Sequence, residues 1–171
     1  MTRIATFNVN GIRAAARRGF TDWLRERDCD VVALQETRCP ADLVPHDALD
    51  GYHLTHHPGE IPGRNGVAFL TREAPDAVRM GFGSRTFDHE GRYLEIDLTL
   101  AGQPLTLASL YLLKGAAPEG RDADPAKYRR KMRFLASLRA HLTRSRRDAA
   151  RLGREFSLMG DLNIAHTRLD L

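Results

Sequence analysis

Three short apolar stretches with strand character, far apart in the chain, are each followed closely by carboxylate or carboxamide side chains. The stretches and their polar residues are 3–10 with Asn8 and Asn10, 31–34 with Glu36, and 156–159 with Asp161 and Asn163. An uninterrupted apolar run is typical of a strand covered on both faces. Because a sheet can bring distant strand ends to one rim, we expect three buried strands and a polar cluster where they end.

The segment Gly160-Asp161-Leu162-Asn163 is the most informative of these ends. Its glycine permits a close approach, and alternation along an extended chain would direct Asp161 and Asn163 to the same side. The same residues also fit a strand end followed by an Asx-type turn. Glu36 likewise fits a plain surface acid at the end of a strand, so these residues, taken one at a time, leave both interpretations open.

The remaining patterns predict an α/β sandwich in which helices lie outside β-sheets. The expected elements are a short helix containing Phe20, Trp23 and Leu24, a loop over 40–66 with surface histidines, neighbouring strands at 67–71 and 77–80, and an antiparallel hairpin of 93–100 with 105–112 around a turn at 101–104.

A long helix is expected to begin at Asp124-Pro125, because aspartate is a good N-cap and proline is favoured in the first helical turn. Its expected apolar stripe is Tyr128, Met132, Leu135, Leu138 and Leu142, and its expected end is near Arg147 or at Gly153. Between positions 127 and 154 the sequence has eleven basic residues and only one acidic residue, Asp148. Such a run can attract a polyanion, or it can be the solvated face of an arginine-rich helix.

The composition is that of one soluble globular domain spanning residues 1–171, with 42% hydrophobic and 28% charged residues. No apolar run is long enough to span a membrane, and the first residues do not resemble a signal peptide, so we expect a cytoplasmic protein without a membrane partner. Cys29 and Cys39 lack metal-ligand spacing and are expected to be reduced thiols without a role.

The polar strand ends supply oxygen ligands of the kind that Mg²⁺ or Mn²⁺ prefers. Several sequence motifs, in order, then reveal a family. They are Thr6-Phe7-Asn8-Val9-Asn10-Gly11-Ile12-Arg13, Leu34-Gln35-Glu36-Thr37-Arg38, Gly66-Val67-Ala68, Gly91-Arg92, Tyr111 and Gly160-Asp161-Leu162-Asn163-Ile164-Ala165-His166. Together they resemble the exonuclease III branch, which contains AP endonucleases, of the endonuclease/exonuclease/phosphatase superfamily.

The resemblance implies a four-layer α/β sandwich of two facing β-sheets with outer helices. It also implies a Mg²⁺-dependent phosphodiesterase, with Mn²⁺ as a possible substitute, that repairs double-stranded DNA by cutting 5′ to abasic sites and trimming 3′ ends. The full-length form would be a monomer.

The resemblance also assigns roles to individual residues. Glu36 would bind the metal with Asn8 nearby, Asp161 would activate the attacking water, and Tyr111 would lie against the scissile phosphate. The residues expected on the DNA side are Asn10, Arg13, Arg38, Arg92 and Asn163, of which Asn163 also belongs to the catalytic group.

Two departures from the family pattern stand out. Leu112-Leu113-Lys114 replaces a loop that usually carries a proline, and the late Asp and Ser-Asp-His segments of the family have no counterpart. We therefore expect the chain to be the N-terminal two-thirds of the fold, with apolar sheet surface facing water or a partner, and to be weakly active or inactive alone. The alternatives are a catalytically dead nucleic-acid-binding fragment and a phosphodiesterase acting on RNA, nucleotides or phosphoinositides.

Overall fold

The structure, a computed structural model, describes residues 2–121, 123–165 and 167. The strands are β1 (Ile4–Asn8), β2 (Val31–Gln35), β3 (His53–His57), β4 (Val67–Thr71), β5 (Ala77–Met80), β6 (Tyr93–Leu100), β7 (Gln103–Tyr111) and β8 (Glu155–Asp161). The α-helices are α1 (Ile12–Arg17), α2 (Phe20–Arg27) and α3 (Pro125–Arg151), and short 3₁₀ turns occur at Ala41–Leu43, His46–Leu49 and Asp88–Glu90. His166, the last residue of the Gly-Asp-Leu-Asn motif, lies outside the described residues.

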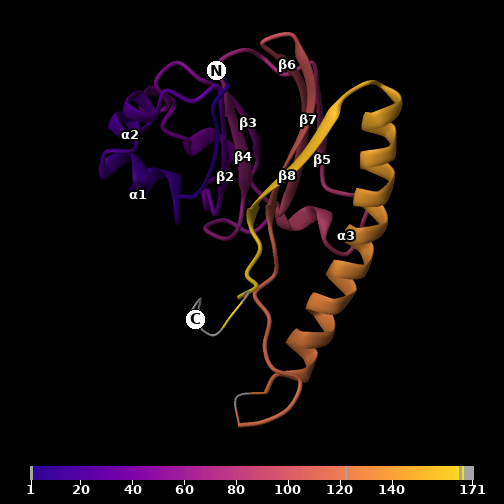
Figure 1. Ribbon diagram of the computed structural model, residues 1–171. Helices are drawn as coiled ribbons and strands as arrows, with labels where there is room; N and C mark the ends of the chain where they lie inside the picture. The colour runs from indigo at the N-terminus through magenta and orange to yellow at the C-terminus, as the bar shows by residue number, and fades with distance from the viewer. Residues whose placement is uncertain (1, 122, 166, 168–171) are drawn as a thin grey trace.

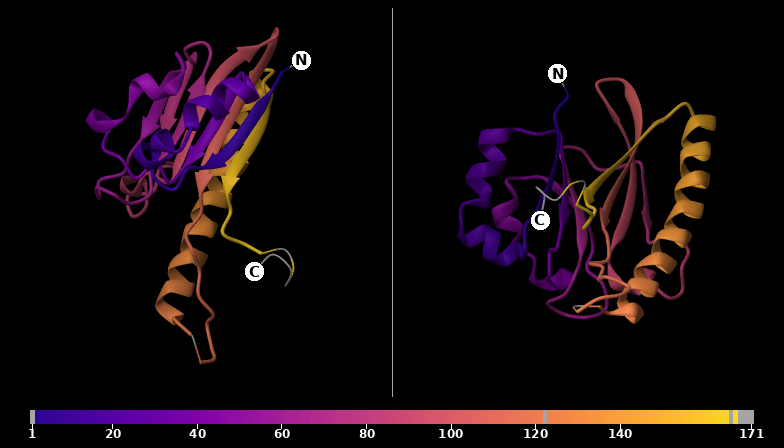
Figure 2. Two further views of the ribbon diagram at one scale, coloured as in Figure 1. Left: turned by 90° about the vertical axis from the view of Figure 1, so that its left-hand side faces the viewer. Right: turned by 60° about the horizontal axis from the view of Figure 1, so that its bottom comes forward.

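The strands form two four-stranded sheets that pack face to face between helical layers (Figure 1). One sheet has the order β1-β2-β4-β3 and is covered by α1 and α2, and the other has the order β5-β6-β7-β8 and is covered by α3. The four-layer α/β sandwich expected from the sequence is confirmed. The lower part of α3 and the connection before it project beyond the sheets (Figure 2).

Strand β2 shows why its apolar run is uninterrupted. Val31 and Ala33 point between the two sheets, where they pack with Leu94 and Leu107 of the second sheet. Val32 and Leu34 point the other way, into the core under α1 and α2. Because side chains alternate along a strand, burial on both faces requires apolar residues at every position.

Helix α3 begins as the sequence predicts, with the Asp124 side chain accepting a hydrogen bond of 2.9 Å from the Lys127 backbone N–H. The predicted apolar stripe is wrong at one position. Met132 is exposed, and the buried residue at that level of the helix is Lys131, which follows Tyr128 by three residues and precedes Leu135 by four. The helix ends at Arg151, just before Gly153.

Two of the three strands expected to be buried are not. Among the described strands β1 pairs only with β2, and β8 pairs only with β7, so both are edge strands. Ile4 and Phe7 on β1 are exposed, and β8 alternates between exposed and half-buried residues over most of its length. Apolar composition alone does not distinguish an edge strand from a central one.

The expected pairing of 67–71 with 77–80 is also wrong. Strand β4 lies between β2 and β3, whereas β5 pairs with β6 in the other sheet. The region 40–66 is mostly loop, as expected, but it also contains β3. The imidazole Nδ1 of His56 within this strand is buried rather than at the surface. Helix α1 was not expected.

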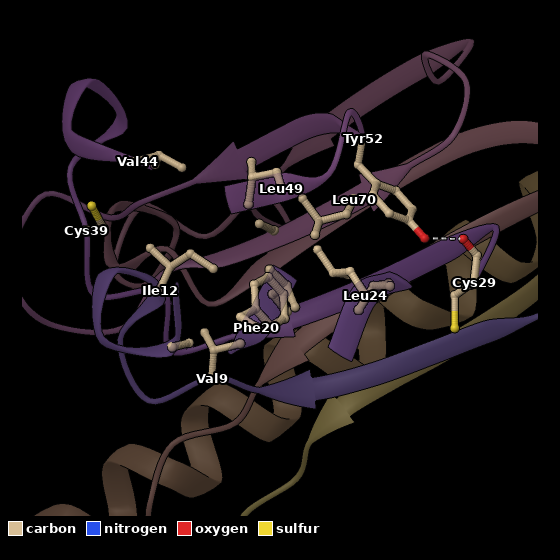
Figure 3. Close-up of a cluster of buried hydrophobic side chains, with 14 residues drawn as sticks. Val9, Ile12, Phe20, Leu24, Cys29, Cys39, Val44, Leu49, Tyr52 and Leu70 are labelled. Atoms are coloured by element: carbon tan, nitrogen blue, oxygen red, sulfur yellow. Dashed lines mark hydrogen bonds between the residues drawn. The ribbon is translucent and has the colours of Figure 1, made fainter. Parts of the chain in front are cut away.

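The hairpin expected from the sequence is confirmed. Strands β6 and β7 form the antiparallel hairpin, although β7 begins earlier than predicted and includes Pro104. Cys29 and Cys39 are both buried free thiols in the same apolar cluster (Figure 3). Among the described residues, no helix combines the length and the apolar character needed to cross a bilayer.

Candidate active site

Two parallel strand pairs, one in each sheet, bring four polar residues to the same rim of the sandwich. The pair β1 and β2 places Asn8 opposite Gln35, so that Glu36 follows directly at this rim. The pair β7 and β8 places Tyr111 opposite Asp161. Parallel strands end on the same side of a sheet, which explains how residues 153 positions apart can meet.

The Asn8 carboxamide lies between the two carboxylates. Its Nδ2 donates a hydrogen bond of 2.9 Å to Glu36 Oε1 and another of 2.9 Å to Asp161 Oδ2. One neutral donor therefore joins two acids that would otherwise repel each other. The amide oxygen of Asn8 is engaged separately, because it accepts a hydrogen bond of 3.0 Å from the Asn10 backbone N–H.

Glu36 is buried yet held in its charged form. Burial alone would raise the pKa of this carboxyl, but hydrogen bonds from Asn8, Tyr111 and Arg38 outweigh burial and lower the pKa below its ordinary value. The pKa of the Tyr111 hydroxyl is raised, because this group is partly buried and lies against the Glu36 carboxylate. Around neutral pH the site thus holds an anionic Glu36 beside a protonated phenol.

The loops that carry the site adopt a left-handed backbone at four residues other than glycine, namely Asn10, Glu36, Arg38 and Asn163, with φ between 46° and 55°. This conformation is unfavourable for most side chains and persists only where neighbouring contacts hold it. At Glu36 the backbone carbonyl accepts a hydrogen bond of 2.7 Å from the Gly11 N–H, and the N–H of Arg38 donates to the Asn65 carbonyl at 2.8 Å.

The turn after β8 is both an Asx turn and part of the candidate site, which are the two interpretations that the sequence left open. Asp161 Oδ1 accepts a hydrogen bond of 2.9 Å from the Asn163 backbone N–H, as in an Asx turn, while Oδ2 faces Asn8. The Asn163 side chain does not join Asp161, because its Nδ2 donates to the Leu112 carbonyl at 2.9 Å. Asp161 is therefore oriented by contacts on both of its oxygens.

Gly160 is required for a close approach, and the approaching group is the neighbouring strand. A Cβ at this position would lie 2.0 Å from the Leu110 carbonyl oxygen, and the Gly160 φ of 139° is one that other residues rarely adopt. Glycine thus lets β8 run against β7 immediately before Asp161.

The residues predicted to face DNA are placed differently from one another. Arg38 forms an ion pair with Glu36 and remains partly exposed. Arg92 is mostly buried behind Tyr111, where its guanidinium lies 4.9 Å from the ring centroid and its Nε donates to Glu90 at 2.7 Å. Asn10 is exposed next to Asn8. Arg13 is exposed on α1, and its charge lies close enough to Cys39 to affect that thiol. Their contact with DNA stays a prediction.

The donor set fits a divalent cation of the Mg²⁺ type. Among the described residues, no cluster of three or more histidine, cysteine, aspartate or glutamate side chains could hold a metal. Mg²⁺ does not need one, since it is commonly bound through one or two carboxylates while waters and substrate phosphates complete its shell. Glu36 and Asp161 converge on one nitrogen and so meet this requirement, whereas the Asn8 oxygen faces the Asn10 N–H.

Two supports of the site were missed by sequence reasoning. The Lys131 Nζ reaches from α3 to the Asn163 carbonyl at 2.8 Å, and a lysine within the apolar stripe of α3 was the available signal. The Gln35 Nε2 donates to Ser109 Oγ at 3.1 Å, and this hydroxyl donates to the Leu34 carbonyl at 3.2 Å, which joins the two sheets behind the rim. No sequence pattern pointed to this link.

Comparison with known proteins gives consistent results. The chain is 30% identical to the exodeoxyribonuclease III of Haemophilus influenzae over 99% of its own length and 60% of that protein. An AP endonuclease structure from Archaeoglobus fulgidus matches with a TM-score of 0.69 and 30% identity, covering 84% of this chain and 52% of that one. The 3′ phosphatase NExo from Neisseria, bound to a product DNA hairpin, matches with a TM-score of 0.78 and 25% identity, covering 98% and 60%.

The chain thus spans about 60% of the length of the Haemophilus relative. The model of the endonuclease/exonuclease/phosphatase family matches residues 5–171, a range that contains the whole Asn8, Glu36, Tyr111 and Asp161 arrangement. On this match and on the shared fold, the protein belongs to the endonuclease/exonuclease/phosphatase family.

Proposed function

We propose that this chain carries the catalytic framework of a metal-dependent DNA-repair phosphodiesterase that cuts 5′ to abasic sites and trims 3′ ends. The observation that carries the proposal is the convergence of Glu36 and Asp161 on the Asn8 carboxamide, with the Tyr111 hydroxyl on the same Glu36 carboxylate. We treat residues 1–171 as part of a single domain of this kind.

The residue types at the rim suit phosphodiester hydrolysis. Mg²⁺ or Mn²⁺ held by Glu36 would neutralise phosphate oxygens and the charge that develops on them. Asp161 is oriented at both oxygens and can direct a water molecule at phosphorus. The Tyr111 phenol, whose pKa is raised, stays protonated, and its single proton, which is given to Glu36 here, could turn to a phosphate oxygen when substrate binds.

The choice of DNA as substrate is supported by similarity and charge. The relatives named above are an exodeoxyribonuclease, an AP endonuclease and a 3′ phosphatase solved with a product DNA hairpin. The chain has a formal net charge of +4, with basic residues concentrated along α3. Such a surface favours a polyanion through counterion release.

The experiment is a cleavage assay on duplex DNA with a single abasic site, with and without Mg²⁺, and in parallel on duplexes with a recessed 3′ end. The wild-type chain is compared with Glu36→Gln, Asp161→Asn and the control Asp148→Asn, whose aspartate is an exposed partner of Arg151 on α3. We expect slow Mg²⁺-dependent cleavage 5′ to the abasic site by wild type and the control, in keeping with the weak activity expected of this chain alone. Asp161→Asn should lower kcat by roughly 10³-fold or more while DNA affinity changes little, because orientation of the water is lost but phosphate contacts remain.

Other outcomes identify the alternatives. Binding of abasic DNA without cleavage under any divalent ion indicates a nucleic-acid-binding protein without catalysis. Hydrolysis of RNA, nucleotides or phosphoinositides in preference to DNA indicates a different substrate within the family. Equal loss of binding and cleavage in Asp161→Asn would contradict the role given to Asp161.

A further inference from the structure

We propose that Lys131 is a positioning residue for Asp161, acting through the Asn163 turn. This inference deepens the proposed function and rests on it for its catalytic consequence, but its geometric part can be tested without activity. Lys131 lies on α3, 30 residues before Asp161 in the sequence, and it comes from the layer outside the sheets.

A continuous chain of contacts leads from Lys131 to the carboxylate. The Lys131 ammonium donates to the Asn163 carbonyl at 2.8 Å, and the N–H of Asn163 donates to Asp161 Oδ1 at 2.9 Å. The Asn163 side chain is fixed at its other end by the Leu112 carbonyl. The lysine therefore restrains the backbone of the residue that orients one oxygen of Asp161.

The turn needs such restraint because Asn163 has a left-handed backbone with φ of 46°. Asparagine tolerates this conformation better than most residues, but it remains a minority state that contacts must select. Lys131 and Leu112 supply these contacts from two separate elements. Without the lysine, the Asn163 carbonyl would lose its protein donor, and the turn would be held only from the side of β7.

The surroundings of Lys131 favour a structural use of its charge. The residue is 8% exposed, and burial lowers the pKa of its ammonium group, while the nearby Asp161 opposes that effect. A Cβ at Gly115 would lie 3.0 Å from Lys131 Cδ, so the loop after β7 packs directly on the lysine stem. Lys131 also borders a hollow of about 520 Å³ together with Lys114, Asp161 and Asn163.

A basic residue needed only for solubility or for attraction of DNA would be exposed, as Lys127 and Arg129 are on the same helix. Lys131 instead takes a position of the apolar stripe and points at the end of β8. Burying an ammonium group costs free energy unless it is paired, which argues that the contact with Asn163 has a function beyond packing.

The first test uses hydrogen exchange and needs no substrate. The Asn163 amide should exchange about tenfold faster in Lys131→Met than in wild type, the effect expected from losing one hydrogen bond. Amides in β7, such as that of Leu107, should keep their protection. Lys131→Arg retains a donor and should restore part of the protection at Asn163. The matched control is Arg147→Met, which removes an exposed charge from the same helix.

The second test measures steady-state cleavage of abasic DNA in the presence of Mg²⁺. Lys131→Met should lower kcat by about 10-fold to 100-fold with KM nearly unchanged, since a misplaced catalytic group affects the transition state more than substrate binding. Lys131→Arg should recover part of kcat, and Arg147→Met should match wild type.

The two tests separate the inference from the proposed function. If wild type cleaves no phosphodiester, the proposed activity fails for this chain, and exchange at Asn163 still decides whether Lys131 holds the turn. Unchanged exchange at Asn163 in Lys131→Met overturns the inference. So does a uniform loss of protection across β7 and β8, which would mean that the lysine only stabilises the fold. A rise in KM without a change in kcat would assign Lys131 to DNA binding instead.

Discussion

At the scale of single residues, the candidate site lies in loops whose backbone adopts unfavourable left-handed conformations. Asn10, Glu36, Arg38 and Asn163 all have left-handed φ values, and each follows directly or closely after a strand. Hydrogen bonds from other loops and from α3 help to hold these residues. Asn10 and Asn163 are also held by the side chains of Asn8 and Asp161 at the ends of their own strands. The carboxylates are thus aimed by long-range contacts, which makes their geometry dependent on the whole fold.

Gly160 gives a prediction at this scale. We expect Gly160→Ala to lower the free energy of unfolding by about 3 kcal/mol or more, because a Cβ would meet the Leu110 carbonyl oxygen and the φ of 139° would become strained. Urea denaturation followed by circular dichroism measures the change. The control is Gly102→Ala, where φ is 81° but nothing lies within 4 Å of the added Cβ, so that only the backbone cost of about 1 kcal/mol is expected. Equal losses in the two variants would contradict the steric argument.

The sequence was sufficient to name the residues of a candidate site but not to orient them. Asn8, Glu36 and Asp161 could be proposed because polar residues at strand ends gather at a rim, and the structure does bring them together. That the Asn8 nitrogen faces both acids, and that Arg92 lies behind Tyr111 on Glu90, depends on side-chain contacts between strands far apart in sequence. Periodicity along one segment carries no information on such contacts.

At the scale of elements, a buried carboxylate fastens α3 to the second sheet. Glu95 on β6 is 1% exposed and accepts hydrogen bonds from Tyr93 at 2.6 Å and from Ser145 of α3 at 2.6 Å. Burial would raise the pKa of Glu95, but hydrogen bonds from His141, Ser145, Tyr93 and Arg79 lower it to about 2. The charged form is therefore the one that holds the helix.

This contact between Glu95 and α3, called the Glu95 clamp below, makes the stability of the fold depend on pH. Because the pKa of Glu95 falls from 4.5 to about 2 on folding, its contribution is complete above pH 4.5 and is lost as the pH falls toward 2. We expect Glu95→Gln to destabilise the protein at pH 7 by on the order of 3 kcal/mol. We also expect the variant to lose less further stability than wild type below pH 4.5, as measured by urea denaturation at several pH values. Glu26→Gln, on the exposed side of α2, should follow the wild-type curve, and a Glu95→Gln curve parallel to wild type would contradict the Glu95 clamp.

Elements that depend on short sequence patterns were predictable. The placing of strands that depends on pairing with distant segments was not. The Asp124 cap and the helix after it, and the hairpin of β6 and β7, follow from short-range patterns. Strands β4 and β5 are consecutive in sequence but lie in different sheets, and β3 is rich in histidine and was missed. Lys131 breaks the apolar stripe of α3 because its partner, the turn after β8, requires a donor at that position.

At the scale of the molecule, both sheets end in edge strands that lie near each other, β1 in one sheet and β8 in the other (Figure 2). Each edge borders a hollow with mostly apolar surface. One, of about 300 Å³, has Phe7, Phe20 and Trp23 in its lining, and the other, of about 440 Å³, lies between α3 and β8. The expectation from the sequence that apolar sheet surface would face water or a partner stays a prediction, and these two hollows are where it can be tested. Open edges with apolar side chains favour association with other chains.

We expect the purified chain to self-associate with increasing concentration, and Phe7→Lys to shift the population toward monomer in sedimentation velocity experiments. Phe7 is 36% exposed on the β1 edge and lies 4.9 Å from the Trp23 ring, so a lysine there can cover the same apolar surface with its stem while its charge opposes strand pairing. Leu152→Lys, at an exposed position after α3 and outside both edges, should sediment as wild type does. If wild type were monomeric at all concentrations, or if both variants reduced association equally, the β1 edge would not be the surface that drives it.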